Sequence, residues 1–218
     1  MNLSDAIVND LMDQWNAATT HAFTEDLCSD VLNDVSWQKY LIQDYAFVGA
    51  LTELVKMMID KCPGQHQRNI FEGFLDVLTG AEDQFFIDAF KKANVPKVQW
   101  SSEQESDVTV KFKELFDRVN EGSYADVLSV LLPVEWIYLT WATNHKNCKP
   151  RDSYNEWILL HNNEEFTKFV MFLKSEFDDA SQGYSEEDRD RMTGYFCTAC
   201  ELEVLFFDHC YIKTLRNT

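Results

Sequence analysis

Residues 36–63 read SWQKYLIQDYAFVGALTELVKMMIDKCP, and this stretch has the periodicity of a long amphipathic helix. The apolar residues recur every three or four positions and form one stripe: Trp37, Leu41, Val48, Leu51, Val55 and Met58. Asp44 falls in the middle of that stripe. An ionised carboxylate that is buried without a partner costs several kcal/mol or more, so we expect Asp44 to have a partner or a ligand. Ser36 is the expected cap, and the helix should end near Lys61, before Pro63.

The composition of the whole chain indicates an all-α protein. Among its 218 residues, 45% are hydrophobic and 14% aromatic, whereas only 7 are Gly and 4 are Pro. Few turn-forming residues favour long helices over many strands. The pattern predicts eight or nine helices, no strand, and a single helical-bundle domain over residues 1–218. The helices are expected at about 4–21, 23–32, 36–61, 67–96, 124–145, 154–163, 164–183, and from Ser185 onward. A further helix should begin at a capping box formed by Ser102 and Glu105 and continue to about residue 119.

The net charge of −18 disfavours nucleic acid and anionic membranes as partners. We see no apolar run of membrane-spanning length and no signal peptide, so we expect a cytoplasmic protein without a membrane partner. Six scattered Cys residues fit reduced thiols. Cys197 and Cys200 have the spacing of a redox or zinc motif, but they lie inside a helical pattern and we interpret them as buried thiols.

Two further acidic residues interrupt apolar stripes. Glu135 lies among Leu128, Leu132, Leu139 and Ala142, and Pro133 should kink the helix just before it. Glu203 lies on a stripe with Phe196, Cys200, Phe207 and Cys210. Glu82 is at the margin of its stripe, and we expect it to be structural. Few Lys or Arg residues interrupt these runs. Carboxylates that converge with aromatic rings in a helical bundle predict a pocket for a flat small molecule rich in N–H groups.

Several segments, in order, resemble the TenA/THI-4 (thiaminase II) family. Three of them are YLIQDYAFV (residues 40–48), LLPVEWIY (131–138) and CELEVLFFDHCY (200–211). The other two are THAFTEDL (20–27) and NEWILLHNNEEF (155–166), and together the segments extend over nearly the whole chain. The resemblance implies a haem-oxygenase-like bundle, a homo-oligomer (dimer or tetramer), and a pocket for the aminopyrimidine half of thiamin breakdown products. The best-known branch has a nucleophilic Cys after LLP. Val134 stands there in this chain and Glu135 follows, which resembles the Cys-lacking branch.

The resemblance also implies an activity and a set of site residues. The activity is thiamin salvage by hydrolysis of aminomethylpyrimidine, of its N-formyl derivative, or of both, to hydroxymethylpyrimidine, with no cofactor and no metal. Asp44, Glu135 and Glu203 are the expected catalytic residues. Asp44 is also expected to bind the pyrimidine edge, together with four aromatic residues: Tyr138, Phe47, Phe207 and Trp136. Phe47 and Phe112 stand where the Cys-containing branch commonly has Tyr.

Other functions fit the residues less well. The main alternative is a non-catalytic protein that binds the same ring or a partner on this scaffold. Haem would require His21 as its axial ligand, beside acidic groups that suit haem propionates poorly. A di-iron bundle requires Glu-x-x-His pairs, and none of the five His residues follows a Glu at that spacing. His161 and His209 are expected to be structural or partly exposed.

Overall fold

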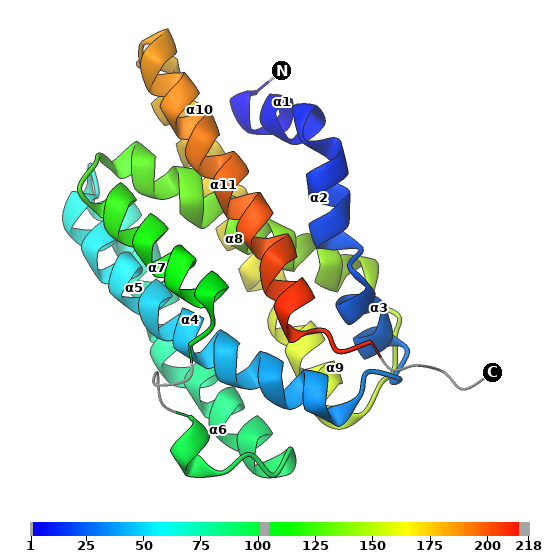
Figure 1. The fold of residues 1–218 in the computed structure, drawn as a ribbon. Helices are drawn as coiled ribbons and strands as arrows, with labels where there is room; N and C mark the ends of the chain where they lie inside the picture. Colours follow the sequence, from blue (N-terminus) through cyan, green and yellow to red (C-terminus); the bar gives the residue numbers. More distant parts are fainter. Residues whose placement is uncertain (1, 101–104, 214–218) are drawn as a thin grey trace.

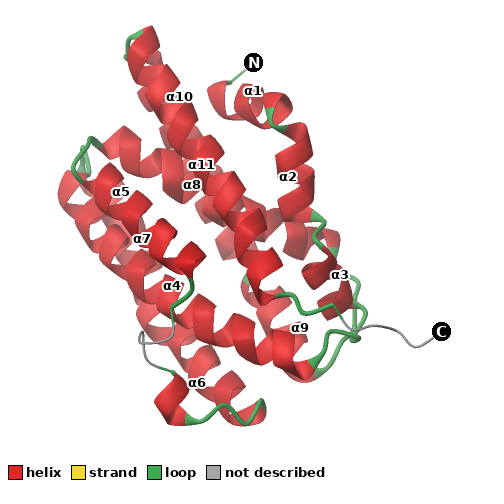
Figure 2. Ribbon diagram, viewed as in Figure 1, coloured by secondary structure: helices red, strands yellow, loops and turns green. Residues whose placement is uncertain are grey.

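The computed structural model describes residues 2–100 and 105–213, and within these ranges the chain forms helices and no strand (Figures 1 and 2). The all-α prediction is therefore confirmed. The elements are α1 (Leu3–Asp10), α2 (Met12–Thr19), α3 (Ala22–Cys28), α4 (Asp34–Lys61), α5 (Gln65–Val77), a π-helical segment η1 (Leu78–Glu82), α6 (Asp83–Lys92), a 3₁₀ turn η2 (Lys97–Gln99), α7 (Asp107–Asn120), α8 (Tyr124–Asn144), α9 (Asp152–Leu160), α10 (Glu164–Gln182) and α11 (Glu186–Cys210).

Helix α8 is the central element of the bundle. It packs most extensively against α10 and α11, and it also contacts α2, α4 and α7 (Figure 1). Its length and composition would suffice to cross a membrane, so the prediction that no run is long and apolar enough was wrong. However, 89% of its most apolar window is buried inside the bundle, which explains its composition. It is the core helix of the bundle.

Helix α4 carries Asp44 and runs along the bundle beside α5 and α7 (Figure 1). Its cap is Asn33, whose side chain accepts a hydrogen bond from the backbone N–H of Ser36 at 2.9 Å. The prediction of Ser36 as the cap was wrong, because the helix begins two residues earlier, at Asp34. The Ser36 hydroxyl instead accepts a hydrogen bond from the backbone N–H of Ile212 at 2.8 Å, which ties the chain's C-terminal segment to α4.

Other helix boundaries differ from the sequence pattern in instructive ways. The first predicted helix divides at Leu11 into α1 and α2, and the helix predicted over 67–96 is interrupted by η1 and ends at Lys92. The start predicted at Ser185 is confirmed, with a capping box to Asp188. Ser102 lies outside the described residues, and α7 is capped by Ser106. Pro133 lies within α8.

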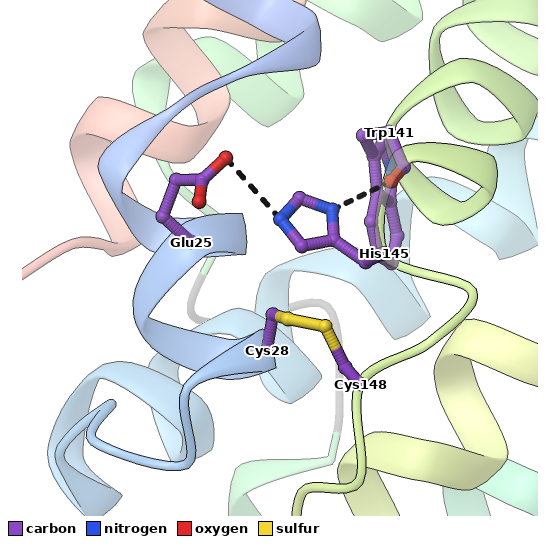
Figure 3. The surroundings of a disulfide bond; sticks show 5 residues. All are labelled: Glu25, Cys28, Trp141, His145 and Cys148. Carbon is purple, nitrogen blue, oxygen red and sulfur yellow. Dashed lines mark hydrogen bonds and ion pairs between the residues drawn. A yellow bond between two sulfur atoms is a disulfide. The ribbon is translucent and has the colours of Figure 1, made fainter.

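A disulfide joins Cys28, at the end of α3, to Cys148, in the loop between α8 and α9 (Figure 3). Its Cα atoms are 5.7 Å apart, although 120 positions separate the two residues in sequence. Beside it, the buried His145 ring contacts Glu25 at 3.2 Å and the Trp141 carbonyl oxygen, which ties α3 to α8 a second time (Figure 3).

The disulfide corrects one prediction made from the sequence. Cys28 and Cys148 are not reduced thiols, whereas Cys62, Cys197, Cys200 and Cys210 are free. Disulfides are uncommon in the reducing cytosol, so these two residues lend no support to a cytoplasmic location. That location remains a prediction.

Candidate active site

A cavity lies between α4, η1, α8 and the α9–α10 region, and acidic side chains are part of its wall. Including its mouth, it has an empty volume of about 470 Å³. Its lining contains three carboxyl groups, from Asp44, Glu82 and Glu135, and a tyrosine, Tyr138. The remaining lining residues are apolar or aromatic apart from one histidine: Phe47, Val48, Leu51, Phe74, Val77, Leu78, Val134, Trp157, Leu160, His161 and Phe166. An apolar cavity with a few convergent polar groups is the usual form of a small-molecule site.

Asp44 is held by two tyrosines at the base of this cavity. The hydroxyls of Tyr40 and Tyr138 lie 2.9 Å apart, and the Trp157 indole N–H donates to the Tyr40 oxygen at 3.0 Å. One hydroxyl proton serves the contact between the tyrosines, so the other is free to donate to the Asp44 carboxyl group. Asp44 is 2% exposed, and its Oδ2 atom is buried without a hydrogen-bond partner within the described chain. This oxygen is therefore able to accept a hydrogen bond from a ligand.

Burial controls the protonation of Asp44. Desolvation raises its pKa to about 7, although the hydrogen bonds from Tyr40 and Tyr138 act in the opposite direction. The same burial raises the pKa of both tyrosines well above the ordinary value, so their hydroxyls stay protonated and act as donors. At neutral pH, Asp44 is therefore near its midpoint of titration and can pair with either a neutral or a protonated ring.

Glu135 and Glu203 form the second acidic part of the site. Glu135, on α8, lines the cavity and is 5% exposed, and burial, with the nearby charges of Glu203 and Asp44, raises its pKa to about 8. Glu203, on α11, is 1% exposed; burial and then Asp44 raise its pKa well above the ordinary value. Glu203 is outside the cavity lining. The structure thus gathers the three acids near one another, with Glu203 behind the wall that Asp44 and Glu135 form.

Glu82, which we expected to be structural, is a further acid of the cavity. It is 8% exposed and lines the cavity from η1, whereas the sequence pattern put it at the margin of its stripe. Burial raises its pKa well above the ordinary value, and the nearby charges of Glu135 and Asp44 add to the effect. The sequence did contain a sign of this position: Glu82 is an acidic residue in a predicted helix whose apolar residues depart there from regular α-helical spacing.

His161, which we expected to be structural or partly exposed, directly follows α9. It is buried and lines the cavity. Burial lowers its pKa to about 4, so the ring is neutral at physiological pH. A neutral ring carries one N–H, and its Nδ1 lies 3.1 Å from the Trp157 carbonyl oxygen. Nδ1 must therefore donate that hydrogen bond, which makes Nε2 an acceptor at the cavity.

The aromatic residues expected to bind the ring fall in three different places. Phe47 lines the cavity and packs edge-on against Phe112, with 4.8 Å between the ring centroids. Phe207 is fully buried outside the lining, nearly parallel to Tyr40 at a 6.3 Å centroid distance, so it supports the tyrosine pair. Trp136 is not at the cavity either: it packs against Trp15 on α2, beneath the Lys174 ammonium at 3.6 Å from its ring.

The position of Trp136 follows from helix geometry. Successive residues of an α-helix point about 100° apart; Val134, Glu135 and Tyr138 cover the cavity side of α8, and Trp136 falls on the side that faces α2. The structure therefore places neither Trp136 nor Phe207 in the cavity lining, whereas Phe47 and Tyr138 are part of it.

No thiol is positioned to act as a nucleophile in the cavity. Val134 lines the wall where the Cys-containing branch carries its nucleophile. The nearby Cys210 is fully buried, and burial together with the Asp44 charge raises its thiol pKa, so it stays protonated. The polar side chains in the cavity lining are the three carboxyl groups, Tyr138 and His161.

Charge and geometry limit which groups the site can hold. None of the described lining residues is Lys or Arg, and residues 2–100 and 105–213 contain no cluster of three His, Cys, Asp or Glu spaced to hold a metal ion. His21, the candidate haem ligand, accepts a hydrogen bond from the Phe23 N–H at Nδ1 and contacts Asp208 through Nε2. Both ring nitrogens are engaged, which does not fit axial ligation. The cavity suits a ligand that brings N–H donors or positive charge.

Comparison with known proteins identifies the family of this chain. The model of the TENA/THI-4/PQQC family matches residues 9–213. The chain belongs to the TENA/THI-4/PQQC family. Relatives of this family with curated names include the aminopyrimidine aminohydrolase of Halalkalibacterium halodurans, 21% identical over 207 residues (93% of this chain, 92% of that protein). Another is the aminopyrimidine aminohydrolase of Helicobacter pylori, 21% identical over 97% of this chain and 99% of that protein.

Solved structures confirm the fold of this family member. The TenA homologue from Pyrococcus furiosus superposes with a TM-score of 0.87 at 18% identity, with 96% of this chain and 100% of that chain covered. Haem oxygenase 2 from Chlamydomonas reinhardtii, solved without haem, has a TM-score of 0.66 at 16% identity, with 95% and 97% covered. The expected haem-oxygenase-like bundle is confirmed, and at these identities the likeness concerns the fold alone.

Proposed function

We propose that this TENA/THI-4 protein is a thiamin-salvage hydrolase that converts aminomethylpyrimidine, its N-formyl derivative, or both into hydroxymethylpyrimidine. The observation that carries the proposal is a buried cavity with three carboxyl groups in its wall and a fourth beside it, all with raised pKa values. The full-length relatives named aminopyrimidine aminohydrolase place the chain with the thiaminase II-like hydrolases.

Asp44 is the proposed anchor of the pyrimidine edge. That edge presents a ring nitrogen, which accepts a hydrogen bond, beside an exocyclic amine, which donates one. The buried Oδ2 atom of Asp44 lacks a partner and can accept the amine N–H. Tyr138 and Tyr40 fix the orientation of the carboxyl group, and Phe47 contributes an apolar wall against the ring. A pre-oriented acceptor loses little freedom when the ligand binds.

Glu135 is the proposed proton donor to the leaving nitrogen. With a pKa of about 8 it is mostly protonated at neutral pH, the condition required of a general acid. The aminomethyl nitrogen first takes the Glu135 proton and becomes an ammonium group; the C–N bond then breaks, ammonia leaves, and water adds to the methylene carbon. The proton released by that water returns to the Glu135 carboxylate, so amine and water become alcohol and ammonia. Glu203 lies outside the cavity lining, so we propose that this buried acid acts through the neighbouring Asp44, whose charge together with burial raises the pKa of Glu203, and not by direct contact with the ring.

Product analysis tests this function directly. The purified protein is incubated with aminomethylpyrimidine, and ammonia and hydroxymethylpyrimidine are quantified over time. We expect both products in equal amounts and with many turnovers per chain. A saturable thermal shift without either product would instead support the alternative, a non-catalytic protein that binds the ring.

The same proposal includes the organisation of the protein. We propose that residues 1–218 act as one domain, that the protein forms a dimer or tetramer, and that it works in the cytoplasm without nucleic-acid or membrane partners. One connected cluster of buried apolar side chains, which extends from α1 to α11, supports the single domain. Light scattering coupled to size-exclusion chromatography measures the assembly, and a monomeric mass would contradict that part.

A further inference from the structure

Glu82 is buried in the cavity wall without any partner that explains its charge. It is 8% exposed, and it forms no hydrogen bond or ion pair with the described residues. Its main electrostatic neighbours are two other acids, Glu135 first and then Asp44. A buried carboxyl group among like charges is costly unless something else supplies a donor or a positive charge.

The π-helical segment is the local cause of this position. Five residues, Leu78–Glu82, form η1 between α5 and α6, which follow one another in Figure 1. A π turn shifts the helical register relative to a regular α-helix, and such turns are frequent at functional sites. Within η1 only Leu78 and Glu82 are buried, and both line the cavity. The segment therefore directs one carboxyl group inward from an otherwise exposed turn.

Glu82 and Asp44 differ in what surrounds them. Tyrosine hydroxyls orient Asp44, whereas Glu82 belongs to the cavity lining together with the apolar residues Phe74, Val77 and Leu78. Asp44 is thus prepared for a planar edge that needs a fixed acceptor. Glu82 and Glu135, which have no such partners, form a site where a compact cation replaces the missing donors.

We propose that Glu82 determines substrate specificity by pairing with the aminomethyl nitrogen of the substrate once that nitrogen has taken the proton of Glu135 and become cationic. This inference rests on the proposed function and deepens it: the cavity selects the free, cationic amine over its neutral N-formyl derivative. The formyl compound carries no positive charge at that nitrogen, so it gains nothing from Glu82. The ammonium group, in contrast, offers donors to both carboxyl groups.

The variant Glu82→Gln separates charge from shape. Gln preserves the size of the side chain and its hydrogen-bonding capacity, but it cannot become anionic. Losing a charge-assisted hydrogen bond lowers affinity by roughly ten- to hundredfold. We therefore expect KM for the amine to rise by about that factor, with kcat and the kinetic constants for the N-formyl derivative changed by less than about threefold. The matched control is Glu72→Gln on the exposed face of α5, which should leave the kinetic constants for both substrates unchanged.

A binding measurement provides a second readout that does not depend on turnover. Calorimetry compares the amine with the neutral product, hydroxymethylpyrimidine, for the wild-type protein and for Glu82→Gln. We expect the variant to lose affinity for the amine and keep its affinity for the alcohol. Equal losses for both compounds, or none for either, would overturn the role of Glu82 alone. A wild-type protein that binds neither compound would overturn the proposed function and this inference with it.

Discussion

Replacing Glu135 by Gln should abolish most activity and stabilise the free protein. The folded-state pKa of Glu135 is raised to about 8 from an ordinary value of 4.5, so at neutral pH about nine-tenths of the molecules carry the proton that a general acid requires. A positioned acid contributes about 10²–10⁴ in rate. Because Gln has the same shape and keeps hydrogen-bonding atoms, we expect kcat to fall by about that factor and substrate affinity to change by less than about tenfold.

The stability effect follows from the same raised pKa. The folded protein keeps a proton on Glu135 that the unfolded chain releases above its pKa of 4.5. The stability that depends on the Glu135 proton is therefore fully present below pH 4.5 and is lost as the pH rises towards about 8. At about 1.4 kcal/mol per pH unit, the loss is about 3 kcal/mol at neutral pH and about 5 kcal/mol above pH 8. Glu135→Gln removes this penalty.

Urea unfolding of both proteins between pH 5 and pH 9, without ligand, measures the difference. We expect the variant to be the more stable protein, with a gap that widens as the pH rises and levels off above about pH 8. The kinetic assay at neutral pH accompanies it. A variant that retains full kcat, or a stability gap that is independent of pH, would refute the role and the protonation state that we assign to Glu135.

Three other predictions follow from the contacts of the site. Asp44→Ala removes the ring anchor and its free oxygen, so affinity for the aminopyrimidine should fall by roughly tenfold or more in calorimetry; unchanged affinity would exclude Asp44 as the anchor. Tyr138→Phe removes one hydroxyl of the hydrogen-bonded tyrosine pair that orients Asp44, so we expect a higher KM with a folded, thermally stable protein; an unchanged KM would contradict the network. Cys28→Ser with Cys148→Ser opens a link across 120 positions and should destabilise the protein by about 2–5 kcal/mol, measured by urea unfolding with and without reductant. A wild-type protein whose stability does not respond to reductant would show that the bond does not form.

Much of the fold could be predicted from apolar periodicity alone. The stripes of α4, α8 and α11 are long and regular, so each fixed a helix and the face that it buries. Asp44, Glu135 and Glu203 stood out because an acid on such a face must be paired, protonated or liganded. The structure gathers them as that argument requires, from three helices that are distant in sequence.

The features that the sequence did not predict depend on details that periodicity does not contain. The burial of Glu82 was not predicted because a π turn changes the register within one helical run. Its side chain is buried at a position that regular α-helical spacing puts at the margin of the stripe. The bond between Cys28 and Cys148 depends on the spatial proximity of the end of α3 and the loop between α8 and α9, which the linear spacing of cysteines does not reveal. His161 became part of the cavity because the end of α9 packs against α8, a tertiary contact.

The most direct test of the central claim is a crystal structure of the Glu135→Gln variant with aminomethylpyrimidine. We predict electron density for a flat ring in the cavity, its amino edge within hydrogen-bonding distance of Asp44 Oδ2 and its aminomethyl nitrogen beside residues 82 and 135. A ligand bound elsewhere, or an empty cavity at a concentration that saturates binding in solution, would contradict the account.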